Sequence, residues 1–356
     1  MSAVIDLAGM GIVSSDIGMV SIDRSTETWP SLPYAELKDT LYAVHMWTQI
    51  VGKIRMALTP LVNHWWNSSL LVTPRGLTTT LIPQGDEGLQ IDFDFIDHEL
   101  VIVTSGGGRS VVPLRPMSVA QFYREVLDEL ARLGVADLHM IPIPVEIAHV
   151  IPFAEDREVR PYDRQQVRRF HDALLRVHNV FDRFRADFLG KASPVQFFWG
   201  GFDLASARFS GRRGPAYAGG SAPNVHIHVM HEAYSHELIA AGFWMGDDDA
   251  PRAEFYSYAM PAPAGIDRAT IRPQTARWVA ARGEFLLPYD AVRTASDPAG
   301  TLLAFLQSTY DAAADLGGWD RPLLEERPNC DCVSLPSSSP SLSHSHSHSR
   351  SRSRGA

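Results

Sequence analysis

The chain has 356 residues, of which 45% are hydrophobic and 21% are charged, and its formal net charge is −9. This length exceeds that of a usual single core, so it predicts two domains or two halves of one body. The acidic balance argues against a nucleic-acid-binding face, which would need an excess of lysine and arginine. No apolar stretch reaches the roughly 18 residues of a membrane-spanning helix, and the N-terminus lacks the basic start of a signal peptide. We therefore expect a soluble, cytoplasmic protein.

The two ends of the sequence differ from its middle. Residues 1–28 are expected to be loose. Residues 328–356 consist largely of Ser, Pro, His and Arg, with little to bury, so this tail is expected to be disordered. Cys330 and Cys332 are the two cysteines of the chain, and they are too close together for a common structural disulfide or a four-ligand zinc site.

Four segments have apolar residues at the three- and four-residue steps of an amphipathic helix. The first covers about 34–58. The second starts near Ser118, which stands three residues before a glutamine as in a capping box. The third covers about 164–188. The fourth follows Asp297 and Pro298, an N-cap with proline at the first helical position.

Strand patterns fill the two gaps between these helices. In the first gap, LQIDFDF alternates apolar and polar side chains, and ELVIVTS, a run of three glycines and SVVPL follow. This order predicts an antiparallel meander. In the second gap, PVQFFWGGFDLASARFS, HEAYSHELIAAGFW, AEFYSYAMP and EFLLPY have the composition of strands. The sequence therefore predicts two antiparallel sheets, each between two helices.

The two parts of the chain also resemble each other locally. DHEL at 97–100 matches SHEL at 235–238, an offset of 138 residues. Together with the shared element order, this match favours an internal duplication. We expect an α+β protein with two related halves, 29–150 and 151–327, each a helix–antiparallel sheet–helix unit with its helices on one side. A ligand site would then lie between the halves.

Long blocks of the sequence resemble one protein family. The blocks are WTQIVGKIRMAL, NHWW, PRGLTT, FDFIDH, SPVQFFWGGFDLA, RFSGR, EAYSHE, GFW, EFLLPYD and WDR. They cover about 29–325, and the chain looks like a member of a widespread, mainly bacterial family with a domain of unknown function. The resemblance implies no settled reaction, substrate or cofactor. The chain departs from the family pattern at Gln196, where a histidine is usual, and at Met245, where a proline is usual.

The stretch HEAYSHELIAAGFW at 231–244 looks similar to a metalloprotease signature. A zincin needs histidines four residues apart on a helix, but His231 and His236 are five apart, so they diverge on a helix and point to opposite faces of a strand. His226 and His228 fit the start of a cupin metal motif on one strand face, although they lie in a stretch peculiar to this chain. Metal binding through this H-x-H pair is kept as an alternative, and no cofactor is predicted.

The matching DHEL and SHEL segments predict equivalent hairpin positions for His98 and His236. A turn histidine often bonds the local backbone, which is a purely structural role. The functional alternative makes His236 a general base near neutral pH, with Glu232 as its acid or orienting partner and Asp203 as a second carboxylate.

Arginines and tryptophans provide candidate ligand-binding residues. Arg75, Arg208 and Arg212 stand near glycines at strand ends, where they could clamp an anion together with backbone N–H groups. Trp199 and Trp244 could line a pocket for an organic ligand, although such residues more often belong to the core.

Taken together, these patterns predict a protein that binds a small molecule, with an anion among the candidates, and an acid–base hydrolase if it is an enzyme. The alternative is a non-catalytic interaction scaffold whose histidines and tryptophans are structural. The sequence leaves the ligand and the oligomeric state open.

Overall fold

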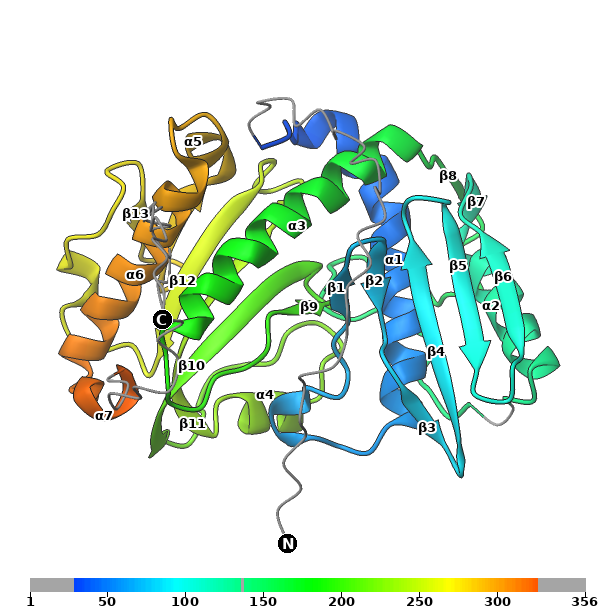
Figure 1. Ribbon diagram of the computed structural model, residues 1–356, viewed down its shortest axis with the longest axis horizontal. Helices are drawn as coiled ribbons and strands as arrows, with labels where there is room; N and C mark the ends of the chain where they lie inside the picture. Colours follow the sequence, from blue (N-terminus) through cyan, green and yellow to red (C-terminus); the bar gives the residue numbers. More distant parts are fainter. Residues whose placement is uncertain (1–28, 136–137, 326–356) are drawn as a thin grey trace, which may run out of the picture.

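Two antiparallel sheets of six strands each form the frame of the computed structural model, which describes residues 29–135 and 138–325 (Figure 1). The ends expected to be loose, at 1–28 and 328–356, lie outside the described residues, as do both cysteines. The expectation of an α+β protein built on antiparallel sheets is confirmed.

The first sheet is formed by six strands from the first half of the chain. These are β1 (Leu71–Thr73), β2 (Gly76–Thr78), β3 (Ile82–Gln84), β4 (Glu87–Asp94), β5 (Glu99–Thr104) and β6 (Arg109–Pro113). They lie in the order β1-β2-β4-β5-β6, and β3 pairs with β4. A short 3-10 helix, η1 (Asn63–Trp65), precedes β1, and the two-stranded pair β7 (Met117–Ser118) and β8 (Val159–Arg160) lies beside this sheet.

Helices α1 (Tyr34–Leu58) and α2 (Val119–Arg132) cover one face of the first sheet. Trp47 of α1 stacks on Phe122 of α2 with ring centroids 4.9 Å apart, and Phe122 lies over Phe93 of β4. Ser118 caps α2 by accepting a hydrogen bond from the Gln121 N–H, as the capping-box spacing predicts. The helical periodicity and the strand alternation thus bring their apolar faces into one core.

The second sheet has the strand order β13-β14-β12-β11-β10-β9. Its strands are β9 (Gln196–Phe198), β10 (Asp203–Arg213), β11 (His236–Trp244), β12 (Glu254–Met260), β13 (Arg277–Val279) and β14 (Glu284–Pro288). The other elements of this half are α3 (Arg164–Ala186), α4 (Ile227–Ala233), η2 (Ile266–Arg268), α5 (Tyr289–Arg293), α6 (Pro298–Leu316) and α7 (Arg321–Glu325). Figure 1 shows α3 and α6 crossing one face of this sheet.

The two faces of the second sheet differ sharply. Leu204, Phe243 and Phe255 are neighbours across β10, β11 and β12, and all three are buried in the main core. This inner face packs against α3 and α6. Because side chains alternate along a strand, Asp203 and Tyr256 point to the opposite, outer face.

The two sheets are joined at their edges. Leu70, next to β1, and Phe197 of β9 exchange both backbone hydrogen bonds, at 2.9 and 2.8 Å. One large hydrophobic core runs through both parts of the chain, and Phe209, Leu238 and Ala240 form a smaller, separate cluster. Two six-stranded sheets fit two related halves, although their strand orders differ, and the internal duplication itself stays a prediction.

The strand expected over 231–244 is wrong in its first part. Residues up to Ala233 belong to α4, and β11 begins only at His236. The matching DHEL and SHEL segments are therefore only partly equivalent. His98 lies in the short turn between β4 and β5, with φ +59°, whereas His236 follows a long connection from β10 that contains α4. None of the helices formed by 29–135 and 138–325 has the length and apolar character needed to cross a membrane.

Candidate functional site

A cavity of about 300 Å³ opens on the outer face of the second sheet and is called the Asp203 cavity here. Its lining residues come from four strands and the loops next to them: Gly201, Asp203, Trp244, Asp247, Glu254, Tyr256, Arg282, Glu284 and Leu286. Four carboxylates face one guanidinium in this lining, so the cavity is acidic.

Strand register brings these side chains together. Asp203 of β10 pairs with Trp244 of β11, which pairs with Glu254 of β12. Two residues along, Gly242 lies opposite Tyr256, and the missing side chain leaves room for the tyrosine ring. A Cβ atom on Gly242 would come within 2.2 Å of that ring, so the glycine allows Tyr256 to lie flat over the sheet.

Asp203 is the half-buried acid at the centre of the cavity. The Tyr256 hydroxyl donates a hydrogen bond to its Oδ2. Burial raises the pKa of Asp203 to about 6, although the bond from Tyr256 acts in the opposite direction. Burial and the nearby Asp203 raise the pKa of Tyr256 well above its usual value. Asp203 can therefore exchange a proton near neutral pH while Tyr256 stays protonated.

A second carboxyl, Glu146, comes from the connection between the two sheets. A Cβ atom on Gly201 would lie 3.0 Å from Asp203 Oδ1 and 3.4 Å from Glu146 Oε2, so both carboxyls flank the same glycine. Glu146 is an exposed residue as a whole, and its carboxyl end rests against Gly200 and Gly201. Burial of this carboxyl and the nearby Asp203 raise the pKa of Glu146 to about 7.

The remaining charges of the cavity are unequally compensated. Glu254 is 2% exposed and accepts from Arg252 at 2.9 Å and from Arg277 at 3.3 Å, so its charge is neutralised. Glu284 has one weaker partner, Arg282, at 3.5 Å. Burial raises the pKa of Glu284, and Arg282 opposes that shift. The negative charge available to a ligand therefore comes from Asp203, Glu284 and the exposed Asp247, whose carboxylate accepts from the backbone N–H groups of the following loop.

A row of polar groups continues along the outer face. The rings of Tyr256 and Tyr258 stack with centroids 6.2 Å apart, and the hydroxyls of Tyr258 and Tyr234 lie 3.3 Å apart. Gln196 pairs with Ala205 on the same face, and its buried Oε1 has no hydrogen-bond partner among the described residues. An unpaired buried acceptor is costly, so this face can accept further donors.

The structure does not bring His236 and Glu232 together with Asp203. Asp203 pairs with Trp244 at one end of β11, whereas His236 pairs with Arg213 at the other end. Eight residues of extended strand separate the two positions, which is about 27 Å at the usual rise. The acid–base set expected from the sequence is therefore divided between two places.

His236 lies instead in a cluster with His64, Lys191 and Trp66. The rings of His64 and His236 are 5.7 Å apart, His64 Nε2 is 3.3 Å from Lys191 Nζ, and this amine lies 5.4 Å from the Trp66 ring. Glu232 accepts from the backbone N–H of His64 at 3.1 Å. Burial and Lys191 lower the pKa of His64, so this imidazole is neutral near pH 7.

The expected anion clamps lie outside the Asp203 cavity. Arg208 points to the inner face, is 2% exposed and lies 3.5 Å from the Phe184 ring centroid. Burial lowers the pKa of its guanidinium to about 10. In the first sheet, Arg75 is paired with the carboxylates of Asp94 and Asp97. Neither arginine is available to the cavity.

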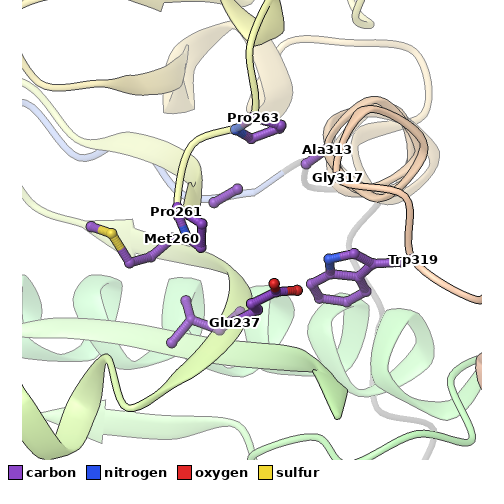
Figure 2. A pocket seen from close by; sticks show the side chains of 9 residues that line it. Glu237, Met260, Pro261, Pro263, Ala313, Gly317 and Trp319 are labelled. Carbon is purple, nitrogen blue, oxygen red and sulfur yellow. The ribbon is translucent and has the colours of Figure 1, made fainter. Parts of the chain in front are cut away.

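Arg212 lies beside a smaller cavity of about 180 Å³, called the Glu237 cavity (Figure 2). Its guanidinium donates to Glu237 Oε2 at 2.8 Å and to the carbonyls of Gly317 and Gly318 at 2.7 and 2.8 Å. Figure 2 shows the Glu237 carboxylate beside the Trp319 ring. The one carboxylate in its lining, Glu237, is already paired with Arg212, so this cavity has fewer groups free to bind or react with a ligand than the Asp203 cavity.

The two tryptophans singled out from the sequence have different positions. Trp199 is 7% exposed, packs against Gly52 and donates its indole N–H to the Ser68 carbonyl at 2.8 Å. It is therefore a core residue. Trp244 lines the Asp203 cavity, and the Arg282 guanidinium lies 5.3 Å from its ring centroid.

The H-x-H pair does not lie on a strand, so that expectation is wrong. His226 is the N-cap of α4, where its ring accepts from the His228 N–H at 3.3 Å, and the two exposed rings stack at 4.6 Å. Among residues 29–135 and 138–325, no group of three or more His, Cys, Asp or Glu side chains is arranged to hold a metal ion.

The fold and the acidic cavity define an α+β protein with two joined antiparallel sheets and a polar site on the second. Comparison with family models matches residues 29–326 to a family of unknown function (DUF5996). The chain belongs to this family, which confirms the resemblance carried by its sequence blocks. No curated protein and no solved structure matches the chain.

Proposed function

We propose that the chain binds a small molecule in the Asp203 cavity and that Asp203 exchanges a proton with it. The observation that carries this proposal is the half-buried Asp203 carboxyl, which lines the cavity and accepts from Tyr256. Its pKa of about 6 suits proton transfer, because a general acid or base works best when its pKa is near the working pH.

The lining favours a cationic or hydroxyl-rich ligand over an anion. Asp203 and Glu284 lack a full ion pair in the cavity. Of the arginines expected to clamp an anion, Arg75 and Arg212 are paired elsewhere, and Arg208 is buried on the inner face of the sheet. Trp244 supplies a flat ring of the kind that packs against a sugar or an organic cation. The volume of about 300 Å³ suits a ligand of the size of an amino sugar, at the small end of ligand pockets.

Acid–base hydrolysis is the reaction class that the site supports best. Glu146 and Asp203 flank the same glycine, with pKa values of about 7 and 6. Near neutral pH, such a pair can hold one proton-donating and one proton-accepting carboxyl. We also keep the cytoplasmic location, the duplicated halves and the absence of a nucleic-acid partner as predictions, the last because the chain is acidic.

Binding can be tested by saturation-transfer NMR and calorimetry with glucosamine, putrescine and spermidine, against glucose 6-phosphate and citrate as anionic probes. We expect a cationic probe to bind and Asp203→Asn to weaken it at least about tenfold, or about 1.4 kcal/mol. Asp92→Asn is the matched control, because Asp92 is a half-buried strand carboxylate on the first sheet. Tighter binding of the anions, or equal binding by wild type and Asp203→Asn, contradicts the proposal.

Hydrolysis can be tested with 4-nitrophenyl esters and glycosides that carry an amino group. We expect turnover that falls in Asp203→Asn and is kept in Asp92→Asn. Binding without turnover would reject the hydrolase. The absence of both binding and turnover would favour the interaction scaffold.

A further inference from the structure

Helix α1 carries polar side chains that face the connection between the two sheets and the Gly200–Gly201 turn. His45 and Gln49 are one turn apart on α1, so they share a face of the helix. Gln49 is completely buried. Its Oε1 accepts from the Val145 N–H at 2.9 Å, and its Nε2 donates to the Val145 carbonyl at 2.8 Å. One side-chain amide thus holds both backbone groups of a single residue.

His45 supports the same contact from the preceding turn. Its Nε2 lies 2.9 Å from the Gly200 carbonyl and therefore donates the hydrogen bond, since a carbonyl can only accept. Burial lowers the pKa of His45 to about 4, so the ring is neutral. Gln49 also reaches the Gly200 carbonyl, at 3.4 Å. Helix α1 is thereby tied to the Gly200–Gly201 turn as well as to Val145.

The residue after Val145 is Glu146, whose backbone is in the left-handed region at φ +60°. This conformation is unfavourable for a glutamate and persists only where the surroundings hold it. The Glu146 N–H donates to the Pro223 carbonyl at 2.8 Å, so the residue is held on both sides. A Cβ atom on Gly200 would lie 2.3 Å from Glu146 Oε1, which shows how closely the carboxyl rests on the turn.

We propose that Gln49 is a positioning residue of the Asp203 site: by holding Val145, it keeps the Glu146 carboxyl beside Asp203, so the carboxyl pair is assembled from both halves of the chain. This inference deepens the proposed function and rests on it for its biological meaning. The titratable groups that face the Glu146 carboxyl are Asp203 from β10 and Tyr234 at the end of α4.

A purely structural role and a positioning role differ in a measurable quantity. If Gln49 only fills space, its loss lowers stability and leaves the ionisation of Glu146 unchanged. If Gln49 positions Glu146, its loss lets the carboxyl move into water and away from Asp203. The pKa of Glu146 then falls toward the ordinary glutamate value of about 4.3.

The experiment uses the full chain labelled with [5-¹³C]glutamate and follows the side-chain carboxyl signals by NMR as a function of pH. In the wild type, we expect one signal with a midpoint near 7, absent in Glu146→Gln. Gln49→Leu is expected to lower that midpoint by at least about one pH unit. Thr48→Val is the control on α1, because Thr48 is buried beside Gln49 and bonds only the helix carbonyl of His45.

A second variant reaches Glu146 from the other side. Gly200→Ala places a methyl group where the Glu146 carboxyl rests, and the flexible end of the glutamate can move away, so the fold is kept. It should lower the midpoint as Gln49→Leu does, with little further change when both are combined. An unchanged midpoint in both variants, or an equal fall in Thr48→Val, overturns the proposal. Because no ligand is added, failure of the ligand panel with a lowered midpoint would reject the binding function and leave the positioning role standing.

Discussion

The outer faces of the two sheets both carry polar side chains, but these side chains differ in their contacts and in their exposure to water. On the first sheet, Gln90 and Asp92 of β4 alternate with buried apolar residues, and Gln90 Nε2 donates to Asp92 Oδ2 at 2.8 Å. On the second sheet, Asp203 and Tyr256 form a bonded pair below the connection that carries Glu146. One face is a partly solvated strand surface, and the other holds carboxyls whose pKa values are raised.

We attribute this difference to the segments that cover the outer face of the second sheet and shield its side chains from water. Ala205 and Ala240 lie on the outer face of the second sheet and are nevertheless buried. Tyr234 closes over Tyr258 from the end of α4. Taking carboxyls out of water raises their pKa values because the charged form loses hydration. A sheet becomes a candidate site when connections remove its polar face from solvent.

The largest effect is expected where packing on the covered face is tightest. Gly242→Ala places a methyl group 2.2 Å from the Tyr256 ring, so the ring must move and leave Asp203. We expect the free energy of unfolding to fall by about 2–3 kcal/mol, measured by urea denaturation. Val101→Ile on the open face of the first sheet should cost less than about 0.5 kcal/mol. Equal losses would contradict the contrast between the faces.

The pH dependence of stability should also separate the two faces. The pKa of Asp203 is about 6 in the folded protein against an ordinary 3.8, so the folded state binds its proton more tightly. Its contribution to stability is complete below pH 3.8 and is lost as the pH rises through 6. In the wild type, this loss should lower the free energy of unfolding by on the order of 2 kcal/mol between pH 4 and 7.5, and Asp203→Asn should abolish that decrease. Urea denaturation across this pH range measures it. Asp92→Asn should show the same pH dependence of stability as the wild type.

The two histidines of the DHEL and SHEL segments provide a smaller contrast. His98 is 6% exposed and its Nδ1 lies 2.9 Å from the Tyr162 hydroxyl, so His98→Ala leaves a buried hydroxyl without this partner. We expect a loss of about 1 kcal/mol in unfolding free energy. His236→Ala should lower the free energy of unfolding by about 0.5 kcal/mol or less, because the His236 side chain is half-buried and, among the described residues, its ring hydrogen-bonds only the adjacent Ser235 side chain. A larger loss for His236→Ala would indicate that its cluster stabilises the fold.

The smallest effect is expected for the exposed ion pair of Arg75 with Asp97, whose side chains are 52% and 65% exposed. Water and salt screen such a pair, so Asp97→Asn should leave the urea midpoint unchanged in 1 M salt. The pair of Arg75 with Asp94 differs, because the Asp94 side chain is 12% exposed. A clear loss in Asp97→Asn at high salt would show that Asp97 contributes more than an ion pair.

Sequence patterns located most elements and part of the candidate site. Asp203 and Trp244 were expected to bind or react, and both line the cavity. Tyr256 and Glu284 were missed, although Tyr256 alternates with Phe255 along a recognised strand, and this alternation indicates its face. No sequence pattern pointed to Glu146, because its proline-rich segment has no periodicity. Its place in the site depends on contact with Gly200 and Gly201, which are far away in the sequence.

The sequence alone determined what depends on near neighbours along the chain. Helical spacing, the Ser118 and Asp297 caps and the alternation in β4 are local, so they could be identified without a structure. Only the tertiary structure decided which acids meet. Strand register placed His236 and Asp203 at opposite ends of β11, and packing of α1 against the connection placed Glu146 beside Asp203. Such contacts join residues far apart in the chain, and their energies depend on burial that no local pattern encodes.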